Sequence, residues 1–529
     1  MNEHFAHHPR LIEAALALNE NRLDVAERLL KPHLKDDPFD VAAIRMLAEL
    51  AGRIGRWRDA ETLLRRAIEL APGWVTAKAN LALVLGRMGR PAEALALLDD
   101  VFAAEPDDVG HMNLKAATLG RIGDFSEGIR LYEQVLERAP GQPRVWLSYG
   151  HLLKTIGRQA DGIDAYRKAI AIRPQLGEAW WSLANLKTIR FDDADVAAMR
   201  DALMSPDLSD DDRLHLHFAL GKAMHDAGRA DDAFEHYTLG NALRLKQQPY
   251  HPEDITRIVD RSVAAFTAAE FANRPGGCES PDPIFIVGMP RAGSTLVEQI
   301  LSSHSLVEGT SELPDIPALV NKVGRYPAAL LELSESDRRA LGTEYLKRAS
   351  VQRRTGRPFL IDKLPNNWLH VQFIKLILPN AKIVDARRHP LACCLSNFRQ
   401  HFARGQNFTY DLDHVGRYYA DYVRLMAHID AVLPGRVHRV IYERMVEDTE
   451  AEVRALLDYC GLAFEPQVLE FHKTERAVRT ASSEQVRRPI YRDATDEWRL
   501  YEPHLGALKS ALGPVLDAYP EAPASFSQR

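Results

Sequence analysis

The chain is poor in cysteine, in long apolar runs and in net positive charge. Its four cysteines in 529 residues (Cys278, Cys393, Cys394 and Cys460) show no metal-ligand spacing, which predicts a reduced, cytoplasmic chain without structural disulfides or zinc. No window approaches about 18 consecutive apolar residues, and the N-terminus resembles no secretory signal, so no membrane span is expected. The formal net charge is −6, which argues against a nucleic-acid partner held by bulk basic charge. Any anion site must therefore be local.

The first half is rich in internal repetition. Two sets of residues recur at intervals of 34: Pro38, Pro72, Pro106, Pro140 and Pro174, and Asn21, Gly55, Gly89, Gly123 and Gly157. A small residue lies five positions after each Asn or Gly (Ala26, Ala60, Ala94, Gly128 and Gly162), and a large one lies nine positions after it (Leu30, Leu64, Leu98, Tyr132 and Tyr166). This period resembles that of tetratricopeptide repeats, in which paired amphipathic helices bury their apolar faces by stacking. The resemblance predicts an α-solenoid that binds a peptide or a partner protein.

The repeat pattern weakens toward the middle of the chain. Repeats are clear over 5–180, and a sixth unit recurs at Gly228, Ala233 and Tyr237 after an insertion that breaks the register. We therefore predict a solenoid over 1–270, degenerate in its last part. The stretch PGGCESPDP has no apolar period, so we place a linker at 271–283 and a second domain at 284–529.

Beyond the linker, short apolar runs alternate with helical segments. The strand-like runs are IFIVG at 284–288, FLIDK at 359–363, AKIVDA at 381–386 and VHRVIY at 437–442. This alternation predicts a P-loop-like, three-layer α/β domain with a parallel sheet. Ligands of such sheets bind at the carboxyl ends of the strands. Candidate site residues are therefore expected just after these runs.

The stretch GMPRAGST at 288–295 reads as the loop between the first strand and a helix. Gly288 and Gly293 let backbone N–H groups converge, and the helix that starts near Thr295 presents its positive end to an anion. The lysine of a nucleotide-triphosphate loop is missing, because Ser294 occupies its position and Arg291 lies inside the loop. This difference favours a phosphate group less charged than a triphosphate bound with Mg²⁺.

The stretch PRAGSTL resembles the 5'-phosphosulfate-binding loop of sulfotransferases, whose pattern is P-R-S-G-T-T-L. The resemblance implies the co-substrate 3'-phosphoadenosine-5'-phosphosulfate with no required metal, bound by the loop residues Arg291, Ala292, Gly293, Ser294 and Thr295. In that family the 3'-phosphate is held by an Arg at a strand end and a Ser eight residues later. Arg388 and Ser396 have this spacing after the run AKIVDA, and a guanidinium suits phosphate oxygens.

Four further positions are similar to the protein-tyrosine branch of the sulfotransferases. That resemblance implies Glu312 as the base for the acceptor hydroxyl, and Lys363, with Arg291, as cations that stabilise the leaving phosphate. It also implies donor contacts by Tyr442 in VIYERMV and by Ser482 in SSEQVRRP. Three of these assignments have a simpler alternative: Glu312 as a helix cap, Lys363 as an ion-pair partner, and Tyr442 as a core residue.

Two positions depart from the tyrosine-branch pattern. Gln400 stands where that branch has an Arg, and Glu497 stands where it has a Lys, so the donor contacts at these places are in doubt. The resemblance predicts a sulfotransferase whose repeats present the acceptor, such as a protein tyrosine, or a partner. Two rival functions stay open: a P-loop kinase with Asp385 as its metal-binding acid, and a non-catalytic scaffold.

Overall fold

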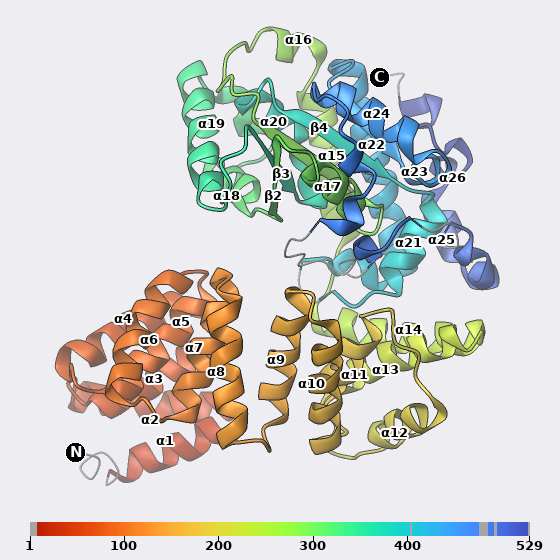
Figure 1. The fold of residues 1–529 in the computed structure, drawn as a ribbon. Coiled ribbons are helices and arrows are strands. Elements are labelled where there is room, and N and C mark those ends of the chain that lie inside the picture. Colours follow the sequence, from red (N-terminus) through yellow and green to blue (C-terminus); the bar gives the residue numbers. More distant parts are fainter. Residues whose placement is uncertain (1–7, 403–404, 475–484, 491–494, 527–529) are drawn as a thin grey trace. The chain divides into compact units, whose positions relative to one another are not determined.

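A computed structural model of the chain describes residues 8–402, 405–474, 485–490 and 495–526. It divides into two compact units, Met1–Arg173 and Pro174–Arg529, which are considered separately below. The first is helical throughout its described part, and the second contains a parallel sheet with helices packed against it (Figure 1). The predicted combination of a helical repeat region and a parallel-sheet α/β domain is confirmed.

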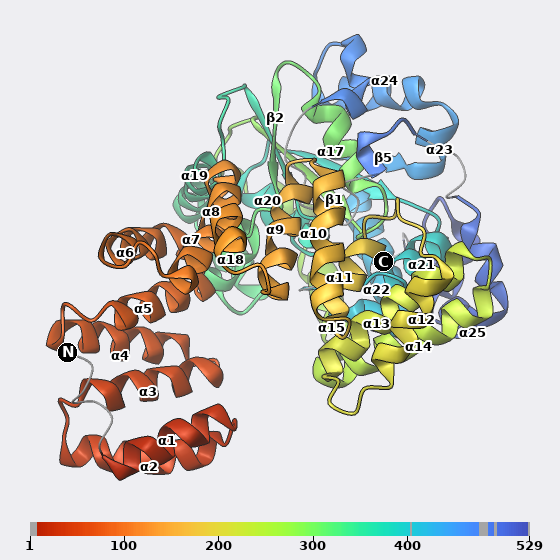
Figure 2. The same ribbon diagram turned by 60° about the horizontal axis from the view of Figure 1, so that its bottom comes forward.

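The first unit is a row of helix hairpins. Consecutive helices pair, and each pair packs on the next, as Figure 2 also shows. The helices are α1 (Pro9–Asn19), α2 (Leu23–Asp36), α3 (Val41–Arg53), α4 (Trp57–Leu70), α5 (Val75–Arg87), α6 (Pro91–Ala104), α7 (Val109–Ile122), α8 (Phe125–Arg138), α9 (Pro143–Thr155) and α10 (Gln159–Ile172).

The repeated residues have the roles that their spacing predicts. Asn21, Gly55, Gly89, Gly123 and Gly157 all have positive φ just after the first helix of a pair, where a left-handed residue closes the helix. Each repeated proline lies two residues after the second helix, which it cannot continue. The small and large residues of the pattern meet in the interior: Ala60 is fully buried and Leu64 is 2% exposed. The 34-residue period is therefore a period of helix closure and core packing.

The second unit is built on a five-stranded sheet of order β2-β3-β1-β4-β5, with every pairing parallel. The strands are β1 (Pro283–Gly288), β2 (Val307–Ser311), β3 (Phe359–Lys363), β4 (Lys382–Arg387) and β5 (Val437–Ile441). The four predicted strand runs correspond to β1, β3, β4 and β5. The strand β2 was not predicted, because VEGTS has a single large apolar residue and carries Gly and Ser.

Helices cover both faces of this sheet. On one face Ile284 and Val384 pack in a core with Val297 of α17 (Ser294–Ser302) and Leu456 of α24 (Thr449–Cys460). On the other face Phe285 contacts Tyr345 of α19 (Glu335–Ser350), with ring centroids 5.4 Å apart. Every residue of β1 is buried, as expected for a strand covered on both sides.

The remaining elements of the second unit surround this core. They are α11 (Gly177–Ala184), α12 (Asp193–Leu203), α13 (Asp210–Asp226), α14 (Ala230–Gln247), α15 (Pro252–Ala265), α16 (Ala268–Ala272), α18 (Asp315–Val323), η1 (Ala328–Glu332), η2 (Pro365–His370), α20 (Val371–Ile377), α21 (Pro390–Phe398), η3 (Asn407–Tyr410), α22 (Leu412–Val432), α23 (Tyr442–Glu447), η4 (Pro466–Val468), η5 (Phe471–Lys473), η6 (Gln485–Arg487), η7 (Glu497–His504), α25 (Gly506–Leu512), α26 (Pro514–Ala518) and η8 (Ala524–Phe526).

The predicted sixth repeat is the hairpin of α13 and α14, closed by Gly228 at φ 74°. It belongs to the second unit rather than to the first. Asn241 of α14 donates a buried hydrogen bond of 2.9 Å from Nδ2 to the carbonyl oxygen of Phe398, at the end of α21. The compact units therefore divide near residue 173, and the predicted linker at 271–283 lies inside the second unit. The domain limits themselves stay a prediction.

Candidate functional site

Each strand of the sheet ends next to a residue that the sequence singled out. The loop 289–293 follows β1, Glu312 follows β2, Lys363 is the last residue of β3, Arg388 follows β4 and Tyr442 follows β5. Because all five strands are parallel, these five ends lie along one edge of the sheet. The topology therefore gathers the predicted site from segments spread over more than 150 residues of sequence, 288 to 442.

The loop after β1 is held in an unusual backbone conformation. Gly288, Arg291 and Gly293 have φ of 132°, 67° and 97°. A Cβ at Gly288 would lie 2.3 Å from the carbonyl oxygen of Ala386, so only glycine fits there. Helix α21 also supports the loop, because Asn397 donates a hydrogen bond of 2.7 Å from Nδ2 to the carbonyl oxygen of Pro290. The N-cap residue of α17 is Gly293, which leaves that helix end without a capping side chain.

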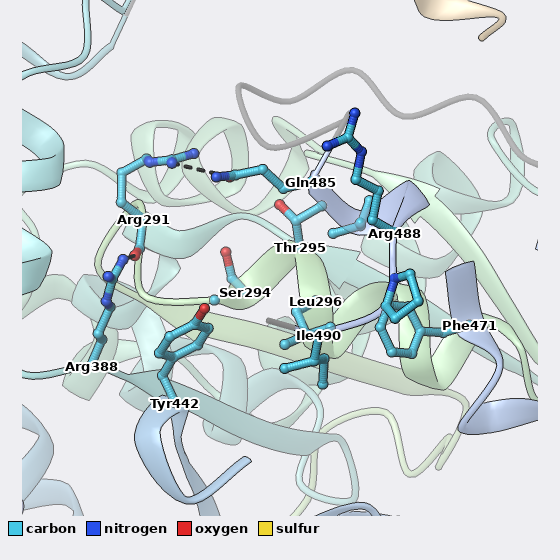
Figure 3. A pocket seen from close by; sticks show the side chains of 13 residues that line it. Arg291, Ser294, Thr295, Leu296, Arg388, Tyr442, Phe471, Gln485, Arg488 and Ile490 are labelled. Carbon is cyan, nitrogen blue, oxygen red and sulfur yellow. Dashed lines mark hydrogen bonds between the residues drawn. The ribbon is translucent and has the colours of Figure 1, made fainter. Parts of the chain in front are cut away.

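The loop and the start of α17 form the wall of a pocket, shown in Figure 3. It is lined by Arg291, Gly293, Ser294, Thr295, Leu296, Arg388, Tyr442, Phe471, Gln485, Val486, Arg488, Pro489 and Ile490. Three of these lining residues are arginines and none is acidic. In a chain of net charge −6, such a lining at a helix N-terminus is a local site for an anion. Of the predicted loop residues, Ala292 is buried and does not line this pocket.

Arg291 and Arg388 connect this pocket with Ser396, which is predicted to bind the 3'-phosphate together with Arg388. Arg291 donates from Nε to Ser396 Oγ at 3.1 Å and from Nη2 to Gln485 Oε1 at 3.2 Å. Arg388 donates from Nη1 to the carbonyl oxygen of Arg291 at 3.4 Å, and its guanidinium lies 4.8 Å from the ring centroid of Tyr442. The structure therefore brings the loop, Arg388, Ser396 and Tyr442 together.

Lys363 and Glu312 form an ion pair at the same edge of the sheet. Lys363 Nζ lies 2.5 Å from Glu312 Oε1 and 4.0 Å from Oε2 of Glu298 on α17. The Lys363 side chain is 2% exposed, whereas that of Glu312 is 49% exposed. The lysine is therefore held in place by burial, while the carboxylate of Glu312 reaches solvent. This arrangement suits a fixed cation beside a base that meets an incoming substrate.

The strand ends that carry Glu312 and Lys363 are held by further side-chain hydrogen bonds. The register of β2 shifts between Gly309 and Ser311, and at this bulge Thr310 donates from Oγ1 to the carbonyl oxygen of Ile361 at 2.6 Å. Asp362 is fully buried and accepts a hydrogen bond of 3.0 Å from the Tyr345 hydroxyl. Burial raises the pKa of Asp362 to about 8, although the hydrogen bonds from Tyr345 and the Leu313 backbone act to lower it. Asp362 therefore packs behind the site, and the described partners of Lys363 are carboxylates of other segments.

Some residues of the pocket were not predicted from the sequence, and one predicted residue lies outside the described residues. Gln485 and Arg488 line the pocket, and both belong to SSEQVRRP, from which only Ser482 was selected. Ser482 falls outside the described residues. The signal was present in the motif, because a Gln and an Arg near a phosphate loop are natural donors to an anion.

The carboxylate of Asp385, the metal-binding acid of the kinase alternative, already has several hydrogen-bond partners. It is fully buried, and its carboxylate accepts from Arg387 Nη2 at 3.1 Å, from Arg439 Nε at 2.9 Å and from the Tyr422 hydroxyl. Two guanidiniums and a phenol leave this carboxylate little capacity to bind Mg²⁺. The geometry therefore disfavours the kinase alternative.

Comparison with family models bears on the class of this domain. The model described as "Sulfotransferase family" matches residues 283–466, which contain the loop, Glu312, Lys363, Arg388 and Tyr442. Residues 283–466 are thus similar to sulfotransferase-family domains. Tetratricopeptide repeat models match 13–75, 54–117 and 113–176 in front of it. The family models thus support the predicted combination of tetratricopeptide repeats with a sulfotransferase domain.

Similar proteins include curated relatives from bacteria and nematodes. An uncharacterized protein of Aquifex aeolicus (strain VF5) is 34% identical over 328 residues, which are 59% of this chain and 43% of that protein. The chain thus spans less than half the length of that relative. A putative protein-tyrosine sulfotransferase of Caenorhabditis briggsae is 22% identical over 41% of this chain and 80% of its own length. Protein-tyrosine sulfotransferase A of Caenorhabditis elegans is 24% identical over 41% of this chain and 60% of its own length.

Among solved structures, the sulfotransferase domain of the Synechococcus PCC 7002 olefin synthase is 22% identical, with a TM-score of 0.33, over 43% of this chain and 90% of that one. The tetratricopeptide protein YrrB is 18% identical, with a TM-score of 0.29, over 34% of this chain and 93% of its own. In the described part of the chain, no helix is both long and apolar enough to cross a membrane.

Proposed function

We propose that this chain transfers a sulfuryl group from 3'-phosphoadenosine-5'-phosphosulfate to an acceptor hydroxyl. The observation that carries the proposal is the joining of the two predicted phosphate sites by one side chain. Arg291 of the loop donates to Ser396, and Arg388 donates back to the loop at the carbonyl oxygen of Arg291. A donor with one phosphate on the 3' side and another on the 5' side of its ribose needs two neighbouring anion sites, whereas a triphosphate needs one.

The 5' end of the donor would bind the loop and the start of α17. Gly293, Ser294 and Thr295 supply the helix N-terminus, and Arg291 supplies a guanidinium. Tyr442 supplies a ring that is already packed on Arg388. Ser482 stays a predicted donor contact. Binding without a required metal also stays a prediction, based on the positive charge of the lining residues.

The chemical step needs one base and a cation near the leaving oxygen. The acceptor oxygen forms a bond to sulfur while the bond from sulfur to the 5'-phosphate oxygen breaks, and the acceptor proton passes to Glu312. Lys363 and Arg291 would stabilise the charge that develops on the leaving phosphate. A carboxylate is a weak base for a phenol with a pKa of about 10, so the proton should leave as the new bond forms.

The proposal also covers the identity of the acceptor and the role of the repeats. The nematode relatives are named as protein-tyrosine sulfotransferases, which makes a tyrosine phenol the first acceptor to test. The repeats would present that acceptor, or a partner protein that carries it. Removal of Met1–Arg173, the first compact unit, should then lower turnover of a protein acceptor more than turnover of a small phenol. An equal fractional loss of turnover for the protein acceptor and for the small phenol would contradict this role. A cytoplasmic location stays a prediction.

Ligand-dependent thermal stability separates the proposal from its two rivals. Adenosine 3',5'-bisphosphate should raise the melting temperature of the full chain, and Arg388→Ala should abolish the rise. Arg339→Ala serves as the matched control, because Arg339 is exposed on α19 and pairs with Glu335. A preference for ATP with Mg²⁺ would favour the kinase, and no response to either nucleotide would favour the scaffold.

A further inference from the structure

A second pocket adjoins the first and is walled partly by helices of the repeat type. The two pockets share Arg291, Arg388 and Gln485. The residues that line only the second pocket include Lys187, Lys222, Ser396, Arg399, Gln400 and Glu497. Its lining residues come from α11, α13 and α14 as well as from the sulfotransferase domain, and all lie in the second compact unit.

The charge of this second pocket is positive. Its lining holds five lysines and arginines against two carboxylates. Asp226 pairs with Lys222, and Glu497 accepts from Arg399 Nη1 at 2.9 Å and pairs with His225 Nε2 at 2.8 Å. Each carboxylate of the lining is thus matched by a cation of the same wall. Lysines and arginines therefore outnumber carboxylates in this lining, which suits an anion.

Both departures from the tyrosine-branch pattern line this pocket, and Lys187 contacts one of them. Gln400 lies four residues after Ser396 and two residues after the end of α21. Lys187 donates from Nζ to Gln400 Oε1 at 3.0 Å, and Gln400 donates from Nε2 to Asn185 Oδ1 at 3.1 Å. A lysine from the helical layer therefore places its charge where the family pattern has an arginine.

Lys187 is held firmly enough to act as a binding residue. It follows α11 in a left-handed conformation, with φ 63°, which is strained for a residue with a side chain. Helix α11 packs closely on α13, because the Gly177 backbone N–H donates a hydrogen bond of 3.0 Å to Asp212 Oδ1. A Cβ at Gly177 would lie only 2.1 Å from the Asp212 carbonyl oxygen. Strain at a residue that lines a charged pocket is common at binding sites.

We infer that Lys187 binds the 3'-phosphate of the nucleotide together with Arg388 and Ser396, and that the helices after the regular repeats are thereby part of the donor site. This inference rests on the proposed function. It assigns the missing arginine contact to a residue 213 positions earlier in the chain. It also explains why α13 and α14, although repeat-like in sequence, belong to the second compact unit.

The test compares two nucleotides that differ in the 3'-phosphate. Affinities of the full chain for adenosine 3',5'-bisphosphate and for adenosine 5'-monophosphate are measured by titration calorimetry in the wild type, Lys187→Gly and Lys187→Arg. Glycine tolerates φ 63°, so Lys187→Gly removes the charge without adding backbone strain. We expect it to weaken bisphosphate binding about 10- to 100-fold, with monophosphate binding unchanged and Lys187→Arg close to the wild type.

The matched control is Lys246→Ala, because Lys246 is exposed near the end of α14 and does not line the pocket. It should change neither affinity. Equal weakening of both nucleotides by Lys187→Gly, or no weakening of either, would overturn the assignment of Lys187 while leaving the donor proposal intact. A wild type that binds the bisphosphate no better than the monophosphate would instead overturn the donor proposal itself, and the assignment with it.

Discussion

The substitution Glu312→Gln isolates the proposed base from the rest of the site. Glutamine keeps the size of the side chain and an oxygen that can accept from Lys363, but it removes the negative charge and the ability to take a proton. In the wild type the two side chains are 2.5 Å apart, with Lys363 buried and Glu312 about half exposed. The variant therefore changes the charge of one atom group without opening space in the core.

The structure sets different magnitudes for stability and for rate. Breaking a fully buried ion pair costs about 3–5 kcal/mol, whereas exposed pairs contribute about 1 kcal/mol or less. Because water reaches Glu312, we expect Glu312→Gln to lower the free energy of unfolding by about 1 kcal/mol. Loss of a general base should lower the rate of sulfuryl transfer roughly 100- to 10,000-fold, equivalent to about 3–5 kcal/mol in the barrier. The stability effect is too small to account for such a loss of rate.

Single-turnover assays with pre-bound donor measure the chemical step directly, and calorimetry with adenosine 3',5'-bisphosphate measures donor binding in the same variant. Donor affinity should stay within about twofold of the wild type, because Glu312 itself does not line the donor pocket. The control is Asp315→Asn in the first turn of α18, which should keep the wild-type rate. A Glu312→Gln enzyme with at least half the wild-type rate would refute the assignment of the base.

Two further predictions concern the loop and the buried carboxyl behind it. Gly293→Ala should lower the free energy of unfolding by about 1–3 kcal/mol and weaken bisphosphate binding, because φ is 97° and the new Cβ would lie 2.9 Å from the Tyr442 ring; unchanged melting temperature and affinity would contradict this. Burial raises the folded-state pKa of Asp362 to about 8, so the folded protein retains a proton that the unfolded chain releases above about pH 4. The free energy of unfolding should therefore fall as the pH rises from about 4 to about 8, and Asp362→Asn should flatten this dependence in denaturant titrations; a dependence as steep as in the wild type would show that another group causes it.

The repeat region could be predicted closely because its signals are local. A glycine that closes one helix and a proline that follows the next act within a few residues, so their period maps directly onto α1 to α10. The apolar runs of the central strands β1, β3 and β4 were equally visible, since strands covered on both faces are largely apolar. The edge strand β2 lacks that signature, because one of its sides is not paired and its sequence, VEGTS, is half polar.

The candidate site was predictable where a residue follows a strand. Arg388 and Tyr442 lie just past β4 and β5, and parallel strands bring such positions to one edge. Contacts between distant segments were not predictable. The bond from Lys187 to Gln400 joins residues 213 positions apart, and no spacing in the sequence indicates it. The ion pair of Arg399 with Glu497 likewise became visible only when α21 and η7 were seen together.

The central claim is that this site moves a sulfuryl group, and label transfer tests it most directly. The full chain is incubated in parallel with sulfur-labelled 3'-phosphoadenosine-5'-phosphosulfate and with γ-phosphate-labelled ATP and Mg²⁺, each with a tyrosine-containing peptide and a small phenol. The account predicts that sulfur label reaches an acceptor hydroxyl, with one adenosine 3',5'-bisphosphate released for each group transferred. Phosphate label on the acceptor, without any transfer of sulfur, would contradict it.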